Sequence, residues 1–238
     1  MKIEYIGKCV LLNESSEKVL VIGDLHLGYE GSMRNSGVMI PVKLYEKCIA
    51  DFKEIIAKVK GFVDKIVVLG DVKHEFGRIL PEEWNLIQKF LKLLKEHCKQ
   101  LIIIEGNHDV ILFPIMRQMN IETVDFFIWE GAIFAHGDKD FEKLHADEVK
   151  MWVFGHGHPA IVLREGVTRE SYKCFLTGLY KRKKIILAPS FFPLINGTDA
   201  REFDLGYPFD FKINNFEVIV VGDKLENLNF GKLGKIKN

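Results

Sequence analysis

The chain has 238 residues, of which 47% are hydrophobic and 28% are charged, a balance typical of a globular protein with a substantial core. Lys plus Arg and Asp plus Glu both number 33, so the formal net charge is zero and no global basic field indicates nucleic-acid binding. The sequence contains no run of about 18 uninterrupted apolar residues, so no membrane span is expected.

The four cysteines are widely separated, and none forms a Cys-x-x-Cys motif. This spacing favours reduced, mostly buried thiols, as in a cytoplasmic protein, over a disulfide framework. The first ten residues, MKIEYIGKCV, contain Glu4 and lack a long apolar stretch, so no signal peptide is expected.

Short apolar runs alternate with amphipathic segments along the first two thirds of the chain. This order of strands and helices predicts an α/β core with parallel strand pairs. From Ile161 onward short β-like runs dominate, which predicts a more antiparallel second half within a single domain spanning 1–238. In chain order we expect a strand at 19–22, a helix over 42–59 entered through Pro41, a strand at 66–69, a helix over 81–97, and strands at 101–104, 132–135, 151–154 and 185–188.

Five predicted strands run directly into turns that contain Asp, His or Asn. A single such residue after a strand usually has an ordinary structural role, but six of the eight histidines lie in these five turns. In open α/β sheets, sites form just beyond the carboxyl ends of strands, so turns that are distant in sequence can meet at one edge. The five stretches are VLVIGDLHLG, IVVLGDVKHEF, LIIIEGNHD, AIFAHGD and MWVFGHGHP.

The side chains in these turns form the ligand set of a divalent transition metal. Carboxylates, an amide and imidazoles suit manganese, iron or zinc, and the lack of cysteine argues against a structural zinc site. Asp24, Asp71 and Asn107 together with four histidines exceed the needs of one ion, so we expect two ions that share a carboxylate. Two ions about 3.5–4 Å apart can clamp the attacking and leaving oxygens of an in-line phosphoryl displacement.

Taken in order, the motifs resemble those of the calcineurin-like metallophosphoesterase superfamily: Asp24-Leu25-His26, Gly70-Asp71, Gly106-Asn107-His108-Asp109, His136 and Gly155-His156-Gly157-His158. The resemblance implies a four-layer αββα sandwich of two mixed β-sheets flanked by helices. It also implies two divalent ions, manganese in the first place, with nickel, iron or zinc as alternatives. One ion would bind Asp24, His26, Asp71 and His158, and the other would bind Asp71, Asn107, His136 and His156, with Asp71 bridging.

The same resemblance implies catalytic roles for three further side chains. His108 would protonate the leaving oxygen or stabilise the transition state, and Asp109 would orient its ring. His74 follows the bridging Asp71 by three residues, an offset at which DNA-break-repair nucleases of the superfamily carry a catalytic histidine. The segment with Arg34, Gly37 and Pro41 also looks like the branch of the ligase-associated DNA-damage-response endonucleases, for which a homodimer is plausible.

These features predict a phosphodiesterase or nuclease in which metal-activated hydroxide attacks a phosphodiester, with DNA or RNA as candidate substrates and no membrane partner. The alternative on the same site is a phosphomonoesterase or nucleotide phosphatase. A binding module that has lost catalysis is disfavoured, because such proteins typically lose ligands and every ligand position is filled here.

Several charged residues near the motifs have no single assigned role. Asp138 stands where a second histidine often follows the third motif, and we interpret it as a turn carboxylate that hydrogen-bonds a ligand. Lys73 and Arg78 are candidates either for phosphate contacts or for a solvated loop. Arg34 could reach the site or fix its own loop.

Two segments in the second half also have two interpretations. The basic run 181–184 is typical of a hairpin turn with solvated charges, and its alternative is a patch that follows a nucleic-acid backbone. Phe191 and Phe192 favour core or dimer contacts over base stacking, because no series of aromatic residues accompanies the basic run.

Overall fold

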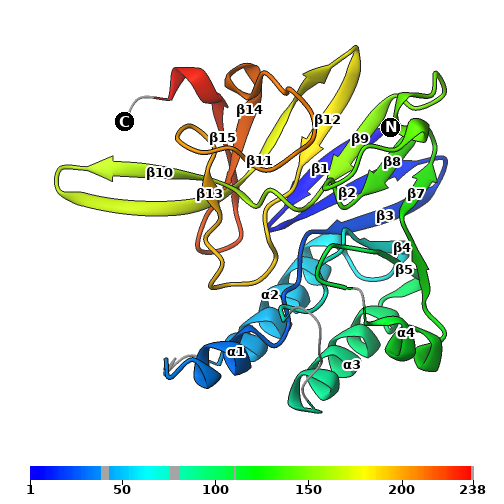
Figure 1. The fold of residues 1–238 in the computed structure, drawn as a ribbon. Coiled ribbons are helices and arrows are strands. Elements are labelled where there is room, and N and C mark those ends of the chain that lie inside the picture. The colour runs from blue at the N-terminus through cyan, green and yellow to red at the C-terminus, as the bar shows by residue number, and fades with distance from the viewer. Residues whose placement is uncertain (39–42, 76–80, 110, 237–238) are drawn as a thin grey trace.

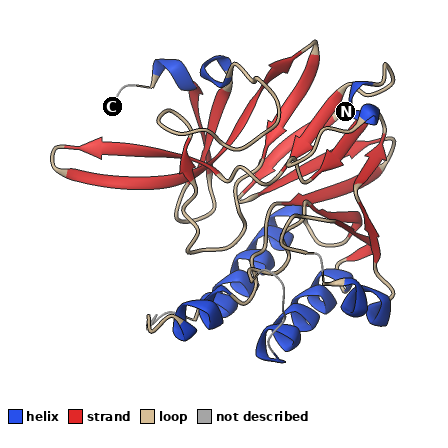
Figure 2. Cartoon of the chain, in the orientation of Figure 1, coloured by secondary structure: helices blue, strands red, loops and turns tan. Residues whose placement is uncertain are grey.

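The protein is described here by a computed structural model that covers residues 1–38, 43–75, 81–109 and 111–236. Two mixed β-sheets pack against each other, and the α-helices cover the outer face of the first sheet (Figure 1, Figure 2). A shared hydrophobic cluster lies between the sheets; Phe134, Val153 and Phe175 enter it from the second sheet, and Val10 and Val67 are among those from the first. None of the described helices is long and apolar enough to cross a membrane.

The first sheet has six strands in the order β1-β2-β3-β4-β5-β6. The first three strands form antiparallel hairpins, whereas β3, β4, β5 and β6 are parallel neighbours. The parallel strands are connected through helices, as the alternating pattern of the sequence predicts. Their bounds are β1 (Lys2–Ile6), β2 (Cys9–Glu14), β3 (Glu17–Ile22), β4 (Val63–Val68), β5 (Cys98–Ile104) and β6 (Glu122–Val124).

The second sheet has nine strands, with the main path β13-β10-β11-β12-β9-β8-β7 and with β14 and β15 attached beside β11. Strands β8, β9 and β12 are parallel, and most of the remaining pairs are antiparallel. The bounds are β7 (Phe126–Trp129), β8 (Ala132–Ala135), β9 (Met151–Phe154), β10 (Pro159–Glu165), β11 (Thr168–Tyr180), β12 (Lys183–Leu187), β13 (Thr198–Asp199), β14 (Glu217–Val221) and β15 (Asn227–Lys232).

Helices α2, α3 and α4 each bury apolar side chains and contact strands of the first sheet. In α2 (Leu44–Val59), Cys48, Phe52, Ile55 and Val59 recur at helical spacing and are buried. The other helices are α1 (Tyr29–Asn35), α3 (Pro81–Lys95) and α4 (Phe113–Met119). Helix α2 lies in the connection between β3 and β4, and α3 lies in the connection between β4 and β5. These two connections determine where the three parallel strands end.

The outer face of the second sheet is covered by 3-10 helices and an aromatic loop instead of α-helices. Along β9 the side chains alternate: Val153 faces the shared cluster, and Trp152 and Phe154 enter a second apolar cluster. Phe211 closes that cluster, and Trp152 donates a hydrogen bond from Nε1 to the Leu144 carbonyl at 2.9 Å. The 3-10 helices are η1 (Glu142–His145), η2 (Ile213–Asn215) and η3 (Leu233–Lys235).

All of the strands and helices expected from the sequence are present; β8 and β9 have the expected ends, and the ends of the others are shifted. The helix expected over 42–59 is α2, and Pro41 and Val42 lie outside the described residues. The helix expected over 81–97 ends at Lys95. The elements that the expectation did not include are β1, β2, β6, β7, β13, β15, α1 and α4.

Candidate metal centre

Parallel strands of both sheets carry the predicted ligands to one edge of the sandwich. In the first sheet, Asp24, Asp71 and Asn107 follow the carboxyl ends of β3, β4 and β5 within three residues. In the second sheet, His136 and His156 follow the parallel strands β8 and β9. Neighbouring parallel strands end at the same edge, so turns that are far apart in sequence meet here.

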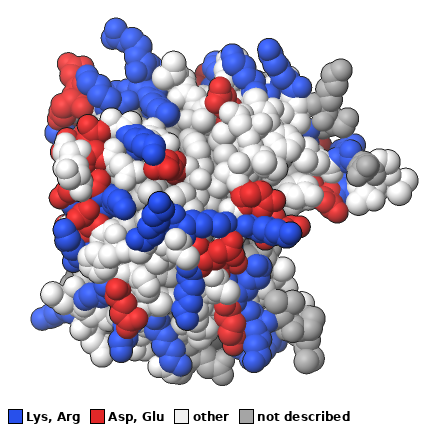
Figure 3. All heavy atoms as spheres, turned by 180° about the vertical axis from the view of Figure 1, so that it is seen from behind, with Lys and Arg blue, Asp and Glu red and all other residues white. Residues whose placement is uncertain are grey.

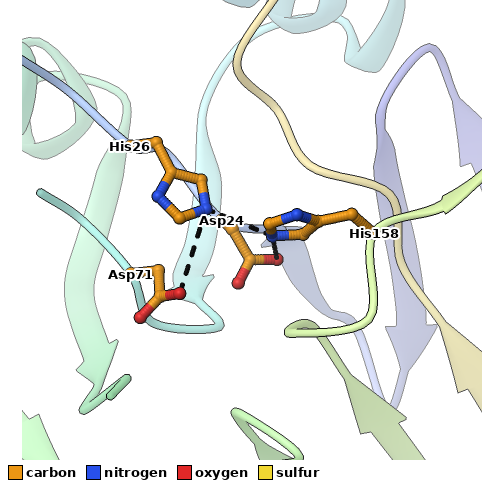
Figure 4. A group of neighbouring side chains, drawn as sticks. All are labelled: Asp24, His26, Asp71 and His158. Atoms are coloured by element: carbon orange, nitrogen blue, oxygen red, sulfur yellow. Dashed lines mark hydrogen bonds and ion pairs between the residues drawn. The ribbon is translucent and has the colours of Figure 1, made fainter. Parts of the chain in front are cut away.

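The first predicted ligand set forms a compact group (Figure 4). Asp24, His26, Asp71 and His158 each offer one ligand atom, and these four atoms lie within 4.8 Å of one another. The Nε2 atoms of His26 and His158 are 3.2 Å apart, and His158 Nε2 is 3.5 Å from Asp24 Oδ2. Asp24, His26 and Asp71 are buried, so their polar atoms have little access to water as a partner.

The second predicted set meets on the other side of Asp71. His136 Nε2 lies 3.5 Å from Asp71 Oδ2 and 2.9 Å from Asn107 Oδ1. His156 Nδ1 is 3.1 Å from the same His136 nitrogen. Asp71 therefore lies between the two sets, at the position that a bridging carboxylate must occupy.

The spacing of the imidazole nitrogens fits divalent ions. Two nitrogens on one ion, each about 2.1 Å from it at angles of about 90–109°, are separated by roughly 3.0–3.4 Å. The His26–His158 and His136–His156 pairs, at 3.2 and 3.1 Å, fall within that range. The Nδ1 atom of His136 hydrogen-bonds the Leu69 carbonyl at 2.8 Å, which leaves Nε2 to act as a ligand.

Left-handed turns and glycines bring the ligands this close. His26, Asp71, His156 and His158 all have positive φ, at 41°, 46°, 62° and 41°. Such backbone is unfavourable for non-glycine residues and persists where the surrounding structure holds it. A Cβ at Gly106 would lie 2.3 Å from Asp71 Oδ1, so only glycine permits the approach of these two turns.

The two acidic residues of the centre have opposite pKa shifts. Burial, together with the charges of Asp24 and Asp109, raises the pKa of Asp71 to about 9. Burial also acts to raise the pKa of Asp24, but the charge and hydrogen bond of His158 and the charges of His136 and His26 outweigh it and lower the pKa. The site thus has two close carboxylates that repel each other, which bound cations would neutralise.

Burial is also the main cause of the lowered pKa values of His26 and His156. Their imidazoles are therefore neutral near pH 7, the protonation state in which histidine binds metal ions. We conclude that the residues present fit divalent metal ions.

The two predicted catalytic histidines lie beside the first set. The His74 and His108 rings stack with centroids 5.9 Å apart, and both rings meet that of His26, at 5.5 and 5.2 Å. His108 Nδ1 hydrogen-bonds the His74 carbonyl at 2.5 Å, and His108 Nε2 lies 3.7 Å from Asp71 Oδ2.

The Asp109 carboxylate connects two turns of the centre. It accepts hydrogen bonds from the main-chain N–H groups of Val72 at 2.9 Å and Gly106 at 3.0 Å. Asp109 therefore ties the turn after β4 to the turn after β5, and its role in orienting the His108 ring stays a prediction.

Tyr207 supports the centre and was not found in the sequence. Its hydroxyl donates to the Gly155 carbonyl at 2.5 Å and accepts from the Gly157 N–H at 3.2 Å. These two glycines flank His156 and precede His158, so one phenol holds the left-handed turn that carries two ligands. Tyr207 lies 49 residues beyond the last motif, and no signal in the sequence around it connects it with the centre.

The charged residues without an assigned role take different positions. Lys73 is fully buried, so it is neither a solvated loop residue nor an exposed phosphate contact. Arg34 is exposed in the last turn of α1, and Arg78 lies outside the described residues. Asp138 is near enough for its charge to raise the pKa values of Asp71 and His156.

The basic run lies at the opposite edge of the second sheet. Lys181 and Arg182 form an exposed left-handed turn, and Lys183 donates to the carbonyls of Ala146 and Val149 at 2.7 and 2.6 Å. The run begins β12, which is parallel to β9, so the strand length of roughly 17 Å separates it from the histidine turn. Phe191 and Phe192 are buried in the core, as expected.

Comparisons with known proteins show the family of the chain and its fold. A family model described as calcineurin-like phosphoesterase matches residues 17–226. The crystal structure of Pseudomonas putida nuclease MPE is similar, with 16% identity, a TM-score of 0.61, and coverage of 93% of this chain and 100% of that chain. Wild-type Vps29 from Entamoeba histolytica complexed with zinc gives 13% identity, a TM-score of 0.36, and coverage of 90% and 99%. No curated protein matches the chain.

Asp71→Asn tests the shared carboxylate. In the wild type the His108 main-chain N–H donates to Asp71 Oδ1 at 3.0 Å. Asparagine keeps an oxygen that can accept this hydrogen bond, but it removes the negative charge of the carboxylate. We expect metal analysis of the purified variant to give fewer than two ions per chain. Hydrolysis should fall by at least about 100-fold, since even groups that only support ligands contribute about 10–100-fold. The control is Asp210→Asn at an exposed carboxylate, which should change neither value.

In metal-free protein the same substitution should be stabilising. The folded pKa of Asp71 is raised to about 9, so the unfolded chain loses this proton at lower pH and stability falls as pH rises from about 4 towards 9. Asparagine has no such proton to lose. At pH 7 the metal-free variant should melt at least about 2–4 °C above metal-free wild type. A lower melting temperature would show that the Asp71 charge is already compensated.

Tyr207→Phe tests the support of the histidine turn. Loss of the hydroxyl leaves the Gly155 carbonyl and the Gly157 N–H without this partner, so metal affinity should fall by about 10-fold with little change in the circular dichroism spectrum. Competition with a chelator measures the affinity. Tyr180→Phe is the control, because Tyr180 packs on the same Phe211 ring but away from the turn. Equal affinities in the two variants would remove Tyr207 from the site.

Proposed function

We propose that this chain, which belongs to the calcineurin-like phosphoesterase family and is therefore a hydrolase of phosphoric esters, cleaves phosphodiester bonds in nucleotides or nucleic acid. The observation that carries the diester preference is the stacking of His74 on His108 next to the predicted ligands. Two imidazoles beside one phosphorus site can serve two ester oxygens, whereas a monoester offers only one. The fold similarity to a nuclease is consistent with this substrate class.

We propose that the ions are manganese. One would be held by Asp24, His26, Asp71 and His158, and the other by Asp71, Asn107, His136 and His156. Carboxylate, amide and imidazole ligands without thiolate favour manganese over metals that prefer sulfur, with nickel, iron and zinc as alternatives. When bound, the ions supply a water of lowered pKa and compensate the charge that develops on the phosphoryl oxygens.

His108 is proposed to donate a proton to the departing oxygen. Its Nδ1 is held by the His74 carbonyl, so Nε2 is the atom that can carry the transferred proton. Burial is the largest cause that lowers the pKa of His108, and the nearby Lys73 charge lowers it further. A lowered pKa makes the protonated ring a stronger acid, which favours transfer to an alkoxide leaving group.

His74 is proposed to bind the ester group that is retained. Its ring lies between that of His108 and the edge of Tyr29, with centroids 4.4 Å apart in the Tyr29 contact. Burial and the charge of His108 lower the pKa of His74, so it is neutral near pH 7 and donates a hydrogen bond without adding charge. Such a group favours a diester, which carries one negative charge less than a monoester.

We further propose that residues 1–238 act as one catalytic domain in a cytoplasmic setting. The four cysteines are free and buried, which is consistent with a reducing compartment. On the face in Figure 3 basic and acidic side chains are interspersed, so nucleic-acid affinity would depend on groups near the centre. A homodimer remains a prediction, to be measured by light scattering.

His108→Ala separates chemistry from metal binding. The substitution removes the proton donor but none of the predicted ligands, so two ions should remain while kcat falls about 100-fold or more. The rate should be measured with bis(p-nitrophenyl) phosphate and manganese. His97→Ala is the matched control, since His97 lies at the other end of α3 and β5. Loss of ions in His108→Ala would instead make His108 a ligand.

His74→Asn tests the substrate preference. We expect wild type to cleave bis(p-nitrophenyl) phosphate faster than p-nitrophenyl phosphate. The variant should lose about 10-fold or more on the diester and little on the monoester, because only the diester has a retained ester group for His74 to bind. A wild type that prefers the monoester, with equal losses on both substrates in the variant, would identify a phosphomonoesterase.

A further inference from the structure

A cavity of about 350 Å³ lies behind the metal-centre edge, between α2, the start of β11 and the segment after β12. Its volume is at the lower end of the range for small-molecule sites. Three of its lining side chains are lysines, two are carboxylates, and an amide adds a further donor. These are Lys8, Lys47, Lys173, Asp51, Asp223 and Asn196.

Two of the lysines share a single buried carboxylate. Lys8 is 5% exposed, and its Nζ lies 2.5 Å from Asp51 Oδ2 and 2.8 Å from the Phe191 carbonyl. Lys47 Nζ lies 3.1 Å from the other oxygen of Asp51. Each ammonium group has three N–H donors and no acceptor, so both lysines retain donor capacity towards the cavity.

Lys173 is held by carbonyl groups and not by a carboxylate. Its Nζ donates to the carbonyls of Ser190 and Phe192 at 2.7 and 2.5 Å. Burial lowers the pKa of Lys173 well below its ordinary value, and the charge of Lys8 lowers it further. A bound anion would stabilise the protonated form of Lys173. It would therefore oppose the lowering of the Lys173 pKa by burial and by the charge of Lys8.

We propose that this cavity is a second binding site, which takes a phosphate-bearing anion through Lys8, Lys47 and Lys173. The three lysine side chains line the cavity together with Asp51, which already pairs with Lys8 and Lys47, and with the exposed Asp223. Lysine binds phosphate as a point charge, and Asn196 can add a neutral donor. The site contains none of the predicted metal ligands and does not depend on the proposed function.

The anion site is connected to the metal centre through three consecutive residues. The carbonyls of Ser190, Phe191 and Phe192 all accept from Lys8 or Lys173. On the other side of this segment, Ser190 Oγ at 3.1 Å and the Phe191 N–H at 2.8 Å both donate to the main-chain carbonyl of Asp24. An anion that fixes the two ammonium groups therefore also fixes the main chain of a predicted ligand.

The test is calorimetric titration of inorganic phosphate into metal-loaded wild type, Lys47→Glu and Lys53→Glu, and into Asp71→Asn as purified. Lys47→Glu reverses a charge at the cavity on a partly exposed helix position, so it should fold and should weaken phosphate binding at least 10-fold. Lys53→Glu makes the same charge change on the same helix away from the cavity and should bind as wild type. Asp71→Asn should retain the site, because it alters only the metal centre.

A second arm uses a single-stranded DNA 12-mer with phosphorothioate linkages in place of free phosphate. Sensitivity of the 12-mer but not of free phosphate to Lys47→Glu assigns the site to a nucleic-acid phosphate, and the reverse assigns it to a free anion. The proposal is overturned if Lys47→Glu changes neither titration, or if Asp71→Asn alone abolishes phosphate binding. A protein without hydrolytic activity that still shows the Lys47 effect would refute the proposed function and leave this site intact.

Discussion

The centre depends on one constraint, which is that two carboxylates are held close together in the protein interior. Asp24 and Asp71 are buried, and the charge of Asp24 adds to burial in raising the pKa of Asp71. In the absence of cations, the raised pKa of Asp71 lowers stability near neutral pH. Bound divalent cations would reverse the sign of this interaction. The fold therefore holds the two carboxylates in an arrangement that is unfavourable without cations. Because of this arrangement, cation binding is favourable.

The main chain holds this arrangement. His156 N–H donates to Asp24 and His108 N–H donates to Asp71, so both carboxylates are fixed by backbone of turns from other strands. The main-chain carbonyl of Asp71 in turn accepts from the N–H groups of Leu25 and His26. Supporting side chains such as Asp109 and Tyr207 also bond to main-chain groups. Close contact between main chains explains why glycines adjoin the ligands.

The sequence was sufficient to predict the strand ends and the gathering of Asp24, His26, Asp71 and His158, because apolar runs followed by Asp, His or Asn mark the edge of a parallel sheet. It was not sufficient to predict the direction in which a side chain within a motif points. Asp109 follows His108 directly, yet its carboxylate binds the main chain of two turns. Neighbours in sequence point in different directions wherever the backbone turns sharply, and a motif does not record this.

Supporting residues far from the motifs were also beyond prediction. Tyr207, Lys8 and Lys173 lie in segments whose sequence is ordinary for a loop or a strand, and only the fold brings them behind the centre. The outer layer of the second sheet shows the same limit. 3-10 helices and aromatic side chains such as Phe211 cover this sheet, and no helical period in the sequence marks them.

Charge distribution limits how a nucleic acid could be recognised. The chain has no net charge, and its densest basic run lies a strand length away from the centre, where Lys183 already bonds to the main chain. Long-range attraction is therefore weak, and the positive charge nearest a scissile phosphate comes mainly from the ions. Bound cations would attract any phosphate ester, so discrimination would depend on neutral groups close to the predicted ligands, such as His74, whose ring contacts those of His26 and Tyr29. Selection among esters is then a matter of local fit at the centre and not of long-range charge.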